Sequence, residues 1–187
     1  MIIYLVGMSC VGKSTVGRIL AEKTGFTFFD LDEMTQEFYH KPIEMIQNEC
    51  LTMYEYRKKA SVVLDNIFSK NIDSVVSGTP AGLKFSYLQV FKRHKKDKDL
   101  YSIHLYDTFE NVLNRLTFYD KDSNIVFEPM DEAKRKRYLQ EIIADYRYFE
   151  SSYKRADFQV NIENIEVQDI PEMIMEELRK HLAKPAL

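Results

Sequence analysis

The sequence predicts an α/β fold in which a five-stranded, mostly parallel sheet forms the middle of three layers, flanked by helices on both faces. Short apolar segments alternate along the chain with longer segments whose apolar residues recur at helical spacing. This alternation is typical of parallel sheets covered by helices. A glycine-rich segment separates the first apolar run from the first helical pattern. The length of 187 residues suits one buried core. We therefore expect residues 1–187 to form a single domain.

The glycine-rich segment carries the strongest functional signal. Residues 7–15 read Gly-Met-Ser-Cys-Val-Gly-Lys-Ser-Thr and fit the phosphate-binding P-loop pattern G-x-x-x-x-G-K-[ST]. Gly7 and Gly12 let the backbone curl so that successive N–H groups point at phosphate oxygens. Lys13 can reach the outer phosphates, and the Ser14 hydroxyl suits the Mg²⁺ that accompanies a nucleotide. The segment therefore predicts binding of ATP and Mg²⁺.

The residues around this motif agree with it. Residues 2–6 form an apolar run typical of a strand buried on both faces, and apolar residues then recur at helical spacing until Gly25. The new helix turns its N-terminus, with free N–H groups and a positive dipole end, toward the bound anion. We expect the nucleotide to contact Gly7, Cys10, Val11, Gly12, Lys13, Ser14 and Thr15.

Similar patterns predict the other elements. Phenylalanines favour a strand at residues 26–30, and strong helical spacing runs from Tyr54 to Lys70. Further strands are expected at residues 74–77, 100–106 and 158–162. Helices are expected at residues 31–39, from Pro42 onward, at 54–70, 83–92 and 108–118, along a long segment ending near 153, and at 170–181.

Residues 119–129 lose all periodicity and are rich in polar side chains, from Asp120 to Asn124. Irregular loops of this length inside a compact domain are often functional. We expect a lid over the phosphates at about residues 119–130, because closure would exclude water from the transferred group.

Two carboxylates follow the second predicted strand. Asp30 and Asp32 lie at its carboxyl end, where ligands bind in parallel sheets. Beside a P-loop, one can support Mg²⁺ through its water shell while the other accepts a proton from a substrate hydroxyl. The alternative is helix capping, because Asp near a helix start accepts backbone N–H bonds.

Composition excludes several other classes of function. The net charge of −3 gives no broad basic field for nucleic acid. Two cysteines, Cys10 and Cys50, argue against a disulfide scaffold and favour a reducing, cytoplasmic location. The sequence shows no charged leader and no apolar stretch of about 20 residues, so we expect neither secretion nor a membrane span. A monomer is the simplest expectation for a domain of this size.

Several of these segments together resemble the shikimate kinases. The resemblance begins at residues 12–18, Gly-Lys-Ser-Thr-Val-Gly-Arg, and continues through Asp30-Leu31-Asp32. It returns at Glu55-Tyr56-Arg57 and in the run from Arg147 to Asp157. The resemblance implies that Asp30 supports Mg²⁺ and Asp32 contacts the acceptor hydroxyls, with Lys13 and Asp32 as the catalytic residues. It also implies that Arg57 and Arg147 clamp a carboxylate, a task that suits the planar guanidinium. Without the resemblance, both would be surface arginines on helices.

The sequence departs from the family at two places. The family has three glycines after its third strand, whereas here Gly78 is followed by Thr79 and Pro80. The resemblance assigns Gly78 to the acceptor site, which the two larger residues narrow. The family's lid also carries an Arg-Pro-Leu-Leu run that is missing here, so we expect Arg115 or Lys121 to supply the positive charge.

These observations predict transfer of the γ-phosphoryl group of ATP to a hydroxyl of a small molecule, with shikimate giving shikimate 3-phosphate as the first choice. Two alternatives stay open. One is a kinase for another small hydroxy acid, a sugar acid or a nucleotide, since gluconate kinases have a similar P-loop opening. The other is an ATP-binding regulatory module without turnover, which the missing lid arginine and lost glycines favour.

Overall fold

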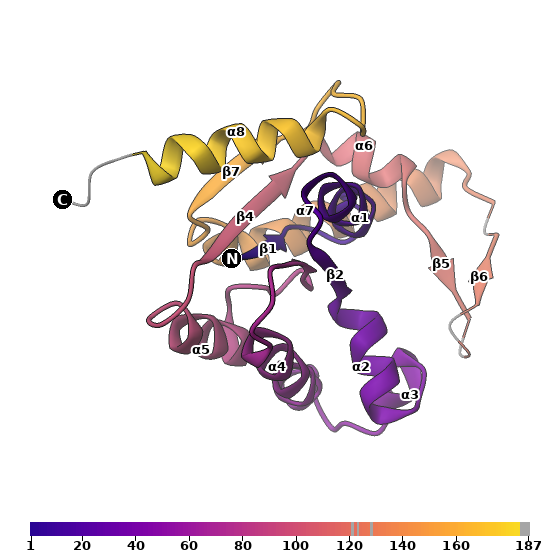
Figure 1. Ribbon diagram of the computed structural model, residues 1–187. Coiled ribbons are helices and arrows are strands. Elements are labelled where there is room, and N and C mark those ends of the chain that lie inside the picture. Colours follow the sequence, from indigo (N-terminus) through magenta and orange to yellow (C-terminus); the bar gives the residue numbers. More distant parts are fainter. Residues whose placement is uncertain (121, 123, 128, 184–187) are drawn as a thin grey trace.

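The computed structural model describes residues 1–120, 122, 124–127 and 129–183. Its centre is a five-stranded sheet in the order β2-β3-β1-β4-β7, in which all neighbouring strands run parallel (Figure 1). The five-stranded parallel sheet predicted above is thereby confirmed. The strands are β1 (Ile2–Val6), β2 (Thr27–Asp30), β3 (Ser74–Ser77), β4 (Leu100–Tyr106) and β7 (Phe158–Asn161).

Helices cover both faces of this sheet. They are α1 (Lys13–Thr24), α2 (Leu31–Tyr39), α3 (Ile43–Asn48), α4 (Met53–Ser69), α5 (Phe85–His94), α6 (Phe109–Asn114), α7 (Glu132–Tyr153) and α8 (Ile170–Leu182). In Figure 1, α1 and α8 lie on one side of the sheet and α4 and α5 on the other. None of the helices in the described ranges is long and apolar enough to cross a membrane.

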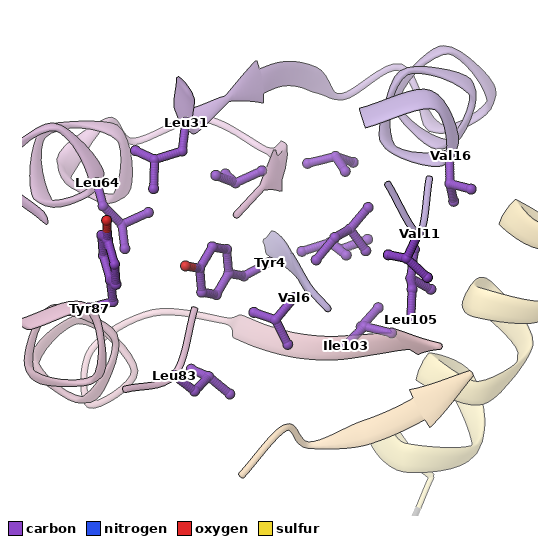
Figure 2. Packing of buried hydrophobic residues seen from close by; sticks show 14 of the residues in the cluster. Tyr4, Val6, Val11, Val16, Leu31, Leu64, Leu83, Tyr87, Ile103 and Leu105 are labelled. Carbon is purple, nitrogen blue, oxygen red and sulfur yellow. The ribbon is translucent and has the colours of Figure 1, made fainter. Parts of the chain in front are cut away.

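The side chains of β1 alternate between the two faces of the sheet and pack against the helices on both sides. Successive side chains of a strand point to opposite faces. The Tyr4 ring packs edge-on against Phe68 of α4, at 5.3 Å between centroids, while Leu5 points at α1 beside Gly17. Figure 2 shows Tyr4 directed toward Leu64 and Tyr87. Every residue of β1 is buried, so this strand is the centre of the core.

The parallel register brings the carboxyl ends of the strands to one edge of the sheet. Leu5 and Asp30 are both paired with Ser77, on either side of β3, and Val6 is paired with His104 of β4. The chain leaves β1 at this edge and enters the glycine-rich segment directly. Ligand sites in parallel sheets lie beyond such edges.

Residues 114–130 differ from the prediction. Helix α6 ends at Asn114 instead of 118, and the expected irregular loop contains a two-stranded antiparallel hairpin, β5 (Phe118–Tyr119) and β6 (Ile125–Val126). The side chain of Asp120 organises its turn by accepting the N–H of Asn124 at 2.9 Å. The prediction of a wholly irregular loop was wrong because strands of two residues are too short to show alternation. Figure 1 shows the hairpin projecting away from the central sheet.

Candidate active site

The glycine-rich segment adopts a backbone that only its small residues allow. Gly12 has φ of 104° and caps the start of α1, and Gly7 has φ of 149°. A Cβ atom on Gly7 would lie 2.4 Å from the Leu105 carbonyl oxygen, so no larger residue fits. Val11 anchors the loop because its side chain is fully buried, next to Leu105 in Figure 2. Cys10 also has positive φ, 57°, and lies half-buried within the turn.

Lys13 lies inside this loop. Its ammonium group donates to the carbonyl oxygens of Gly7, at 3.0 Å, and Met8, at 2.6 Å. Burial lowers the pKa of Lys13 to about 8, and the negative charges of Asp32 and Asp30 act in the opposite direction. The cation is thus held where the loop surrounds it, and it remains charged at neutral pH.

Three oxygen-bearing side chains meet beside Lys13. Ser14 Oγ donates to Asp30 Oδ2 at 2.5 Å and lies 3.1 Å from Ser77 Oγ. The pairing of Asp30 with Ser77 across neighbouring strands places these groups together. The other carboxylate oxygen of Asp30 accepts the N–H of Asp32 at 3.0 Å and so caps α2. Asp30 therefore combines the capping and the site-facing roles that the sequence left as alternatives.

Asp32 lies in the first turn of α2, at the same edge of the sheet. The residue is exposed to solvent, although many protein atoms lie around its carboxyl group and weaken its hydration. Desolvation, together with the charge of Asp30 and against that of Lys13, raises the pKa of Asp32 to about 6. At neutral pH the group is mostly ionised, yet it binds a proton more readily than an ordinary aspartate.

Arg115, at the end of α6, contacts the glycine-rich segment from outside. Its guanidinium donates to the Val11 carbonyl oxygen at 3.2 Å and forms an ion pair with Asp107. Burial alone would raise the pKa of Asp107, but hydrogen bonds from Asn111 and Arg115 outweigh it and hold the pKa below its usual value. The other candidate for the lid cation, Lys121, lies outside the described residues.

Gly78 is enclosed by the core. Its N–H donates to the Leu5 carbonyl oxygen at 2.9 Å, and a Cβ atom would lie 2.6 Å from the Tyr4 ring. Packing alone therefore requires glycine at this position. Thr79 follows it and is also buried.

The two arginines expected to form a clamp lie differently. Arg57 of α4 faces inward, with its guanidinium carbon 5.1 Å from the Phe85 ring centroid and 5.6 Å from that of Phe149. Arg147 is exposed on α7. Arg147 follows Asp145 by two residues, so the two side chains point about 200° apart around the helix. Asp145 and Phe149, in contrast, are four residues apart and line the same cavity. The structure therefore does not present Arg147 on the side of α7 that Arg57 contacts.

A cavity of about 230 Å³ adjoins these groups. It opens between the glycine-rich segment and α7, and its wall is mainly apolar. Met8, Ser9, Pro80 and Phe149 are among its lining residues, and Glu141 and Asp145 contribute carboxyl groups. Burial and the neighbouring Glu141 raise the pKa of Asp145, while Arg57 acts in the opposite direction. The cavity connects the phosphate-binding loop to the Phe149 ring on which Arg57 rests.

A phosphate-binding loop, a carboxylate–hydroxyl cluster and a neighbouring cavity are the parts of a small-molecule kinase. A family model described as shikimate kinase matches residues 9–182. The chain belongs to the shikimate kinase family. Membership makes it a phosphotransferase that uses ATP and acts on a hydroxyl group of a small molecule. A shikimate kinase from Sulfurihydrogenibium sp. is 28% identical over 178 residues, which cover 95% of this chain and 98% of that protein.

Solved structures agree on the fold of this shikimate kinase family member. The structure of a shikimate kinase from Acinetobacter baumannii in complex with shikimate superposes with a TM-score of 0.76, at 24% identity, over 98% of this chain and 95% of that one. A gluconokinase from Sinorhizobium meliloti shares the fold at a TM-score of 0.57 and 19% identity, over 96% of this chain and 94% of that one.

Sequence reasoning missed two residues in this region. Ser77 is the last residue of β3, so a polar side chain at a strand's carboxyl end was the available signal. Lys84 was not singled out at all, because a lysine between a turn and a helix normally faces solvent. In the structure its ammonium group lies 5.2 Å from the Phe85 centroid and 5.7 Å from that of Phe149.

Proposed function

We propose that this protein transfers the γ-phosphoryl group of ATP to a hydroxyl of shikimate, giving shikimate 3-phosphate and ADP. The observation that carries the proposal is the meeting of Lys13, the Ser14–Asp30 pair and Asp32 at one edge of the sheet, in a chain of the shikimate kinase family. Such an arrangement supports the roles of a phosphate-binding loop and a neighbouring proton acceptor.

The glycine-rich segment binds the phosphates. Its backbone N–H groups and the N-terminus of α1 face the anion, and Lys13 turns from the loop carbonyls to the phosphate oxygens. Arg115 adds positive charge at the edge of the same loop, which it already contacts through Val11. Catalysis by such groups consists mainly of positioning and charge neutralisation.

The Ser14–Asp30–Ser77 cluster fits Mg²⁺. Hard oxygen ligands suit this ion, which keeps several waters and usually takes only one or two protein ligands beside the phosphates. Ser14 would bind the ion directly, and Asp30 would hold it, with Ser77 adjoining both. When bound, the ion neutralises charge on the β- and γ-phosphates.

Asp32 accepts the proton of the attacking hydroxyl. The acceptor oxygen forms a bond to the γ-phosphorus, the bond from that phosphorus to the leaving oxygen of ADP breaks, and the proton passes to the Asp32 carboxylate. A pKa of about 6 suits this role because the group is ionised at neutral pH yet basic enough to take a proton. Arg57 holds the acceptor's carboxylate, and Gly78 lies at the floor of the acceptor site.

We further propose that the chain acts as a single-domain monomer in the cytoplasm, with residues 119–130 as its lid. Cys10 and Cys50 are both free thiols, which supports a reducing compartment. The low net charge supports a small-molecule substrate and no nucleic-acid partner.

A coupled ADP-release assay with Mg²⁺ and ATP, with and without shikimate, tests the proposal. We expect shikimate to stimulate ADP release, and we expect Lys13→Ala to reduce turnover at least about 100-fold while the circular-dichroism spectrum stays unchanged. Without stimulation, but with ATP binding retained, the acceptor assignment is wrong. A panel of hydroxy acids, sugar acids and nucleotides then separates a kinase for another acceptor from an ATP-binding module without turnover.

A further inference from the structure

Two cations share one pair of phenyl rings beside the cavity. Arg57 lies 5.1 Å from Phe85 and 5.6 Å from Phe149, and Lys84 lies 5.2 Å and 5.7 Å from the same two centroids. The Lys84 ammonium group also lies 3.9 Å from the Tyr148 centroid. All of these distances are within the range of cation–π attraction. Residues from α4, from the segment before α5 and from α7 thus bring two positive charges together.

Neither cation is neutralised by the part of the chain that the structure describes. Among those residues, no carboxylate lies within salt-bridge distance of Arg57 or Lys84, although many of the other basic side chains are paired. Asp145 is near enough to Arg57 for its pKa to respond, but the two do not form an ion pair. Like charges held close together repel each other, and a bound anion would relieve that repulsion.

Lys84 is held in place by its surroundings. Its ammonium group donates to the Tyr148 carbonyl oxygen at 2.7 Å, and the N–H of Leu83 donates to the buried hydroxyl of Ser152 at 2.8 Å. Both bonds tie the segment before α5 to α7. Phe85 follows with φ of 52°, an uncommon conformation for a bulky residue that turns the chain sharply into the helix. The position of the lysine is therefore built into the fold.

The cavity relates these cations to the phosphate-binding loop. Phe149, which both cations contact, lines the cavity together with Met8 and Ser9 of that loop. An acceptor molecule in the cavity can thus direct an anionic group toward Phe149 and a hydroxyl toward the phosphates. Arg147, on the outer side of α7, does not face this space.

We propose that Lys84, and not Arg147, is the second cation that binds the carboxylate of the acceptor together with Arg57. The inference rests on the proposed function, because it assigns a specificity-determining residue to the acceptor site of that reaction. Lys84 does not touch the reacting atoms, so its charge contributes to acceptor binding and leaves the chemical step itself unaffected.

Three variants test this assignment. Lys84→Met removes the charge and keeps the length of the side chain, Lys84→Arg keeps the charge, and Arg147→Met is the matched control. We expect Lys84→Met to raise the KM for shikimate about 10- to 100-fold, the range of a charge-assisted hydrogen bond, with kcat and the KM for ATP nearly unchanged. Lys84→Arg should restore most of the affinity, and Arg147→Met should behave like the wild-type protein.

Binding without turnover separates this inference from the proposed function. Calorimetric titration with shikimate and with its neutral methyl ester is carried out on the wild-type protein and on Lys84→Met. We expect the wild-type protein to prefer the acid and Lys84→Met to lose most of that preference. No binding of the acid, an equal preference in both proteins, or an Arg147→Met effect as large as that of Lys84→Met overturns the assignment. Acid binding that depends on Lys84 without shikimate-stimulated ADP release overturns the proposed function alone.

Discussion

Asp32 is the group whose ionisation should limit activity in acid. Its pKa is raised to about 6, so the carboxylate that accepts the proton is progressively lost as pH falls through 6. When both substrates are far below their KM, the rate depends on the ionisation of groups in the free protein. We therefore expect the rate to fall about tenfold per pH unit below pH 6. Lys13, whose pKa is lowered to about 8, loses its charge above that pH, so the rate should decline a second time there.

The variant Asp32→Asn tests whether Asp32 causes the decline in rate below pH 6. We expect turnover to fall about 10²- to 10⁴-fold, the range of a lost general base, while the affinity for ATP stays close to that of the wild-type protein. The residual activity should no longer decline below pH 6. Equal losses in turnover and in ATP binding would indicate that Asp32 serves only the structure of α2.

The segment between β3 and α5 is an element whose packing can be tested. Gly82 faces β1 so closely that a Cβ atom would lie 2.4 Å from Val6 Cγ1 and 3.2 Å from the Thr79 carbonyl oxygen. Both neighbours are fixed, so we expect Gly82→Ala to lower the free energy of unfolding by about 1–3 kcal/mol, measured by urea denaturation. It should also raise the KM for the acceptor, because the displaced segment carries Lys84.

A second glycine supplies the control for that experiment. Gly25 has φ of 73°, but a Cβ atom at this position would have no neighbouring atom within 4 Å. Asn tolerates this backbone conformation better than other residues with a side chain, so we expect Gly25→Asn to cost less than about 1 kcal/mol, all of it from backbone strain. Gly82 does not have the positive φ of Gly25, so a loss in Gly82→Ala reports crowding against β1, whereas a loss in Gly25→Asn reports backbone conformation. A stability of Gly82→Ala equal to that of the wild-type protein would show that the segment moves away from β1 at no cost.

Elements with a strong local signal were predictable. The run from Ile2 to Val6, the glycine-rich segment and the long α4 all depend on patterns within one stretch of sequence, and the structure confirms them. The β5–β6 hairpin was not predictable, because two-residue strands carry no periodicity. The end of α6 was also misplaced, because nothing in its sequence marks a stop at Asn114.

The parts of the site that depend on contacts between distant segments were harder to foresee. Ser14 and Asp30 could be assigned from their place after strands, but the contribution of Ser77 required the register between β2 and β3. The position of Lys84 beside the Phe85 and Phe149 rings depends on a turn and on the hydrogen bond from the Leu83 N–H to Ser152, which no local pattern reveals. The roles assigned to the individual site residues remain predictions until the variants are measured.

The stability of the whole molecule should depend on pH through His104. This side chain is buried, and its ring stacks on that of Tyr153 with 4.4 Å between the centroids. Burial lowers the pKa of His104 to about 4, although a hydrogen bond with Gln159 acts in the opposite direction. Below pH 6.5 the unfolded chain takes up a proton that the folded chain refuses until about pH 4. Stability is therefore lost progressively as pH falls between these values.

A comparison with His104→Phe isolates this contribution. Phenylalanine keeps a ring against Tyr153 but does not titrate. We expect the wild-type protein to lose more unfolding free energy than the variant between about pH 7 and pH 4.5, measured by urea denaturation at each pH. The opposing contribution of Asp32, whose raised pKa favours the folded state as pH falls, is common to both proteins and cancels. Parallel pH profiles would show that His104 does not contribute.

The strand order has a consequence for synthesis. β1 emerges from the ribosome before the other strands of its sheet, but its two hydrogen-bonded neighbours are β3 and β4, and β4 ends only at Tyr106. Pairings between such distant segments form slowly because closing the intervening chain costs entropy. The phosphate-binding loop is thus translated early but lacks its supporting strands until more than half of the chain has left the exit tunnel. A translating ribosome would therefore expose β1 unpaired for much of elongation, as an apolar segment of the kind that chaperones bind readily.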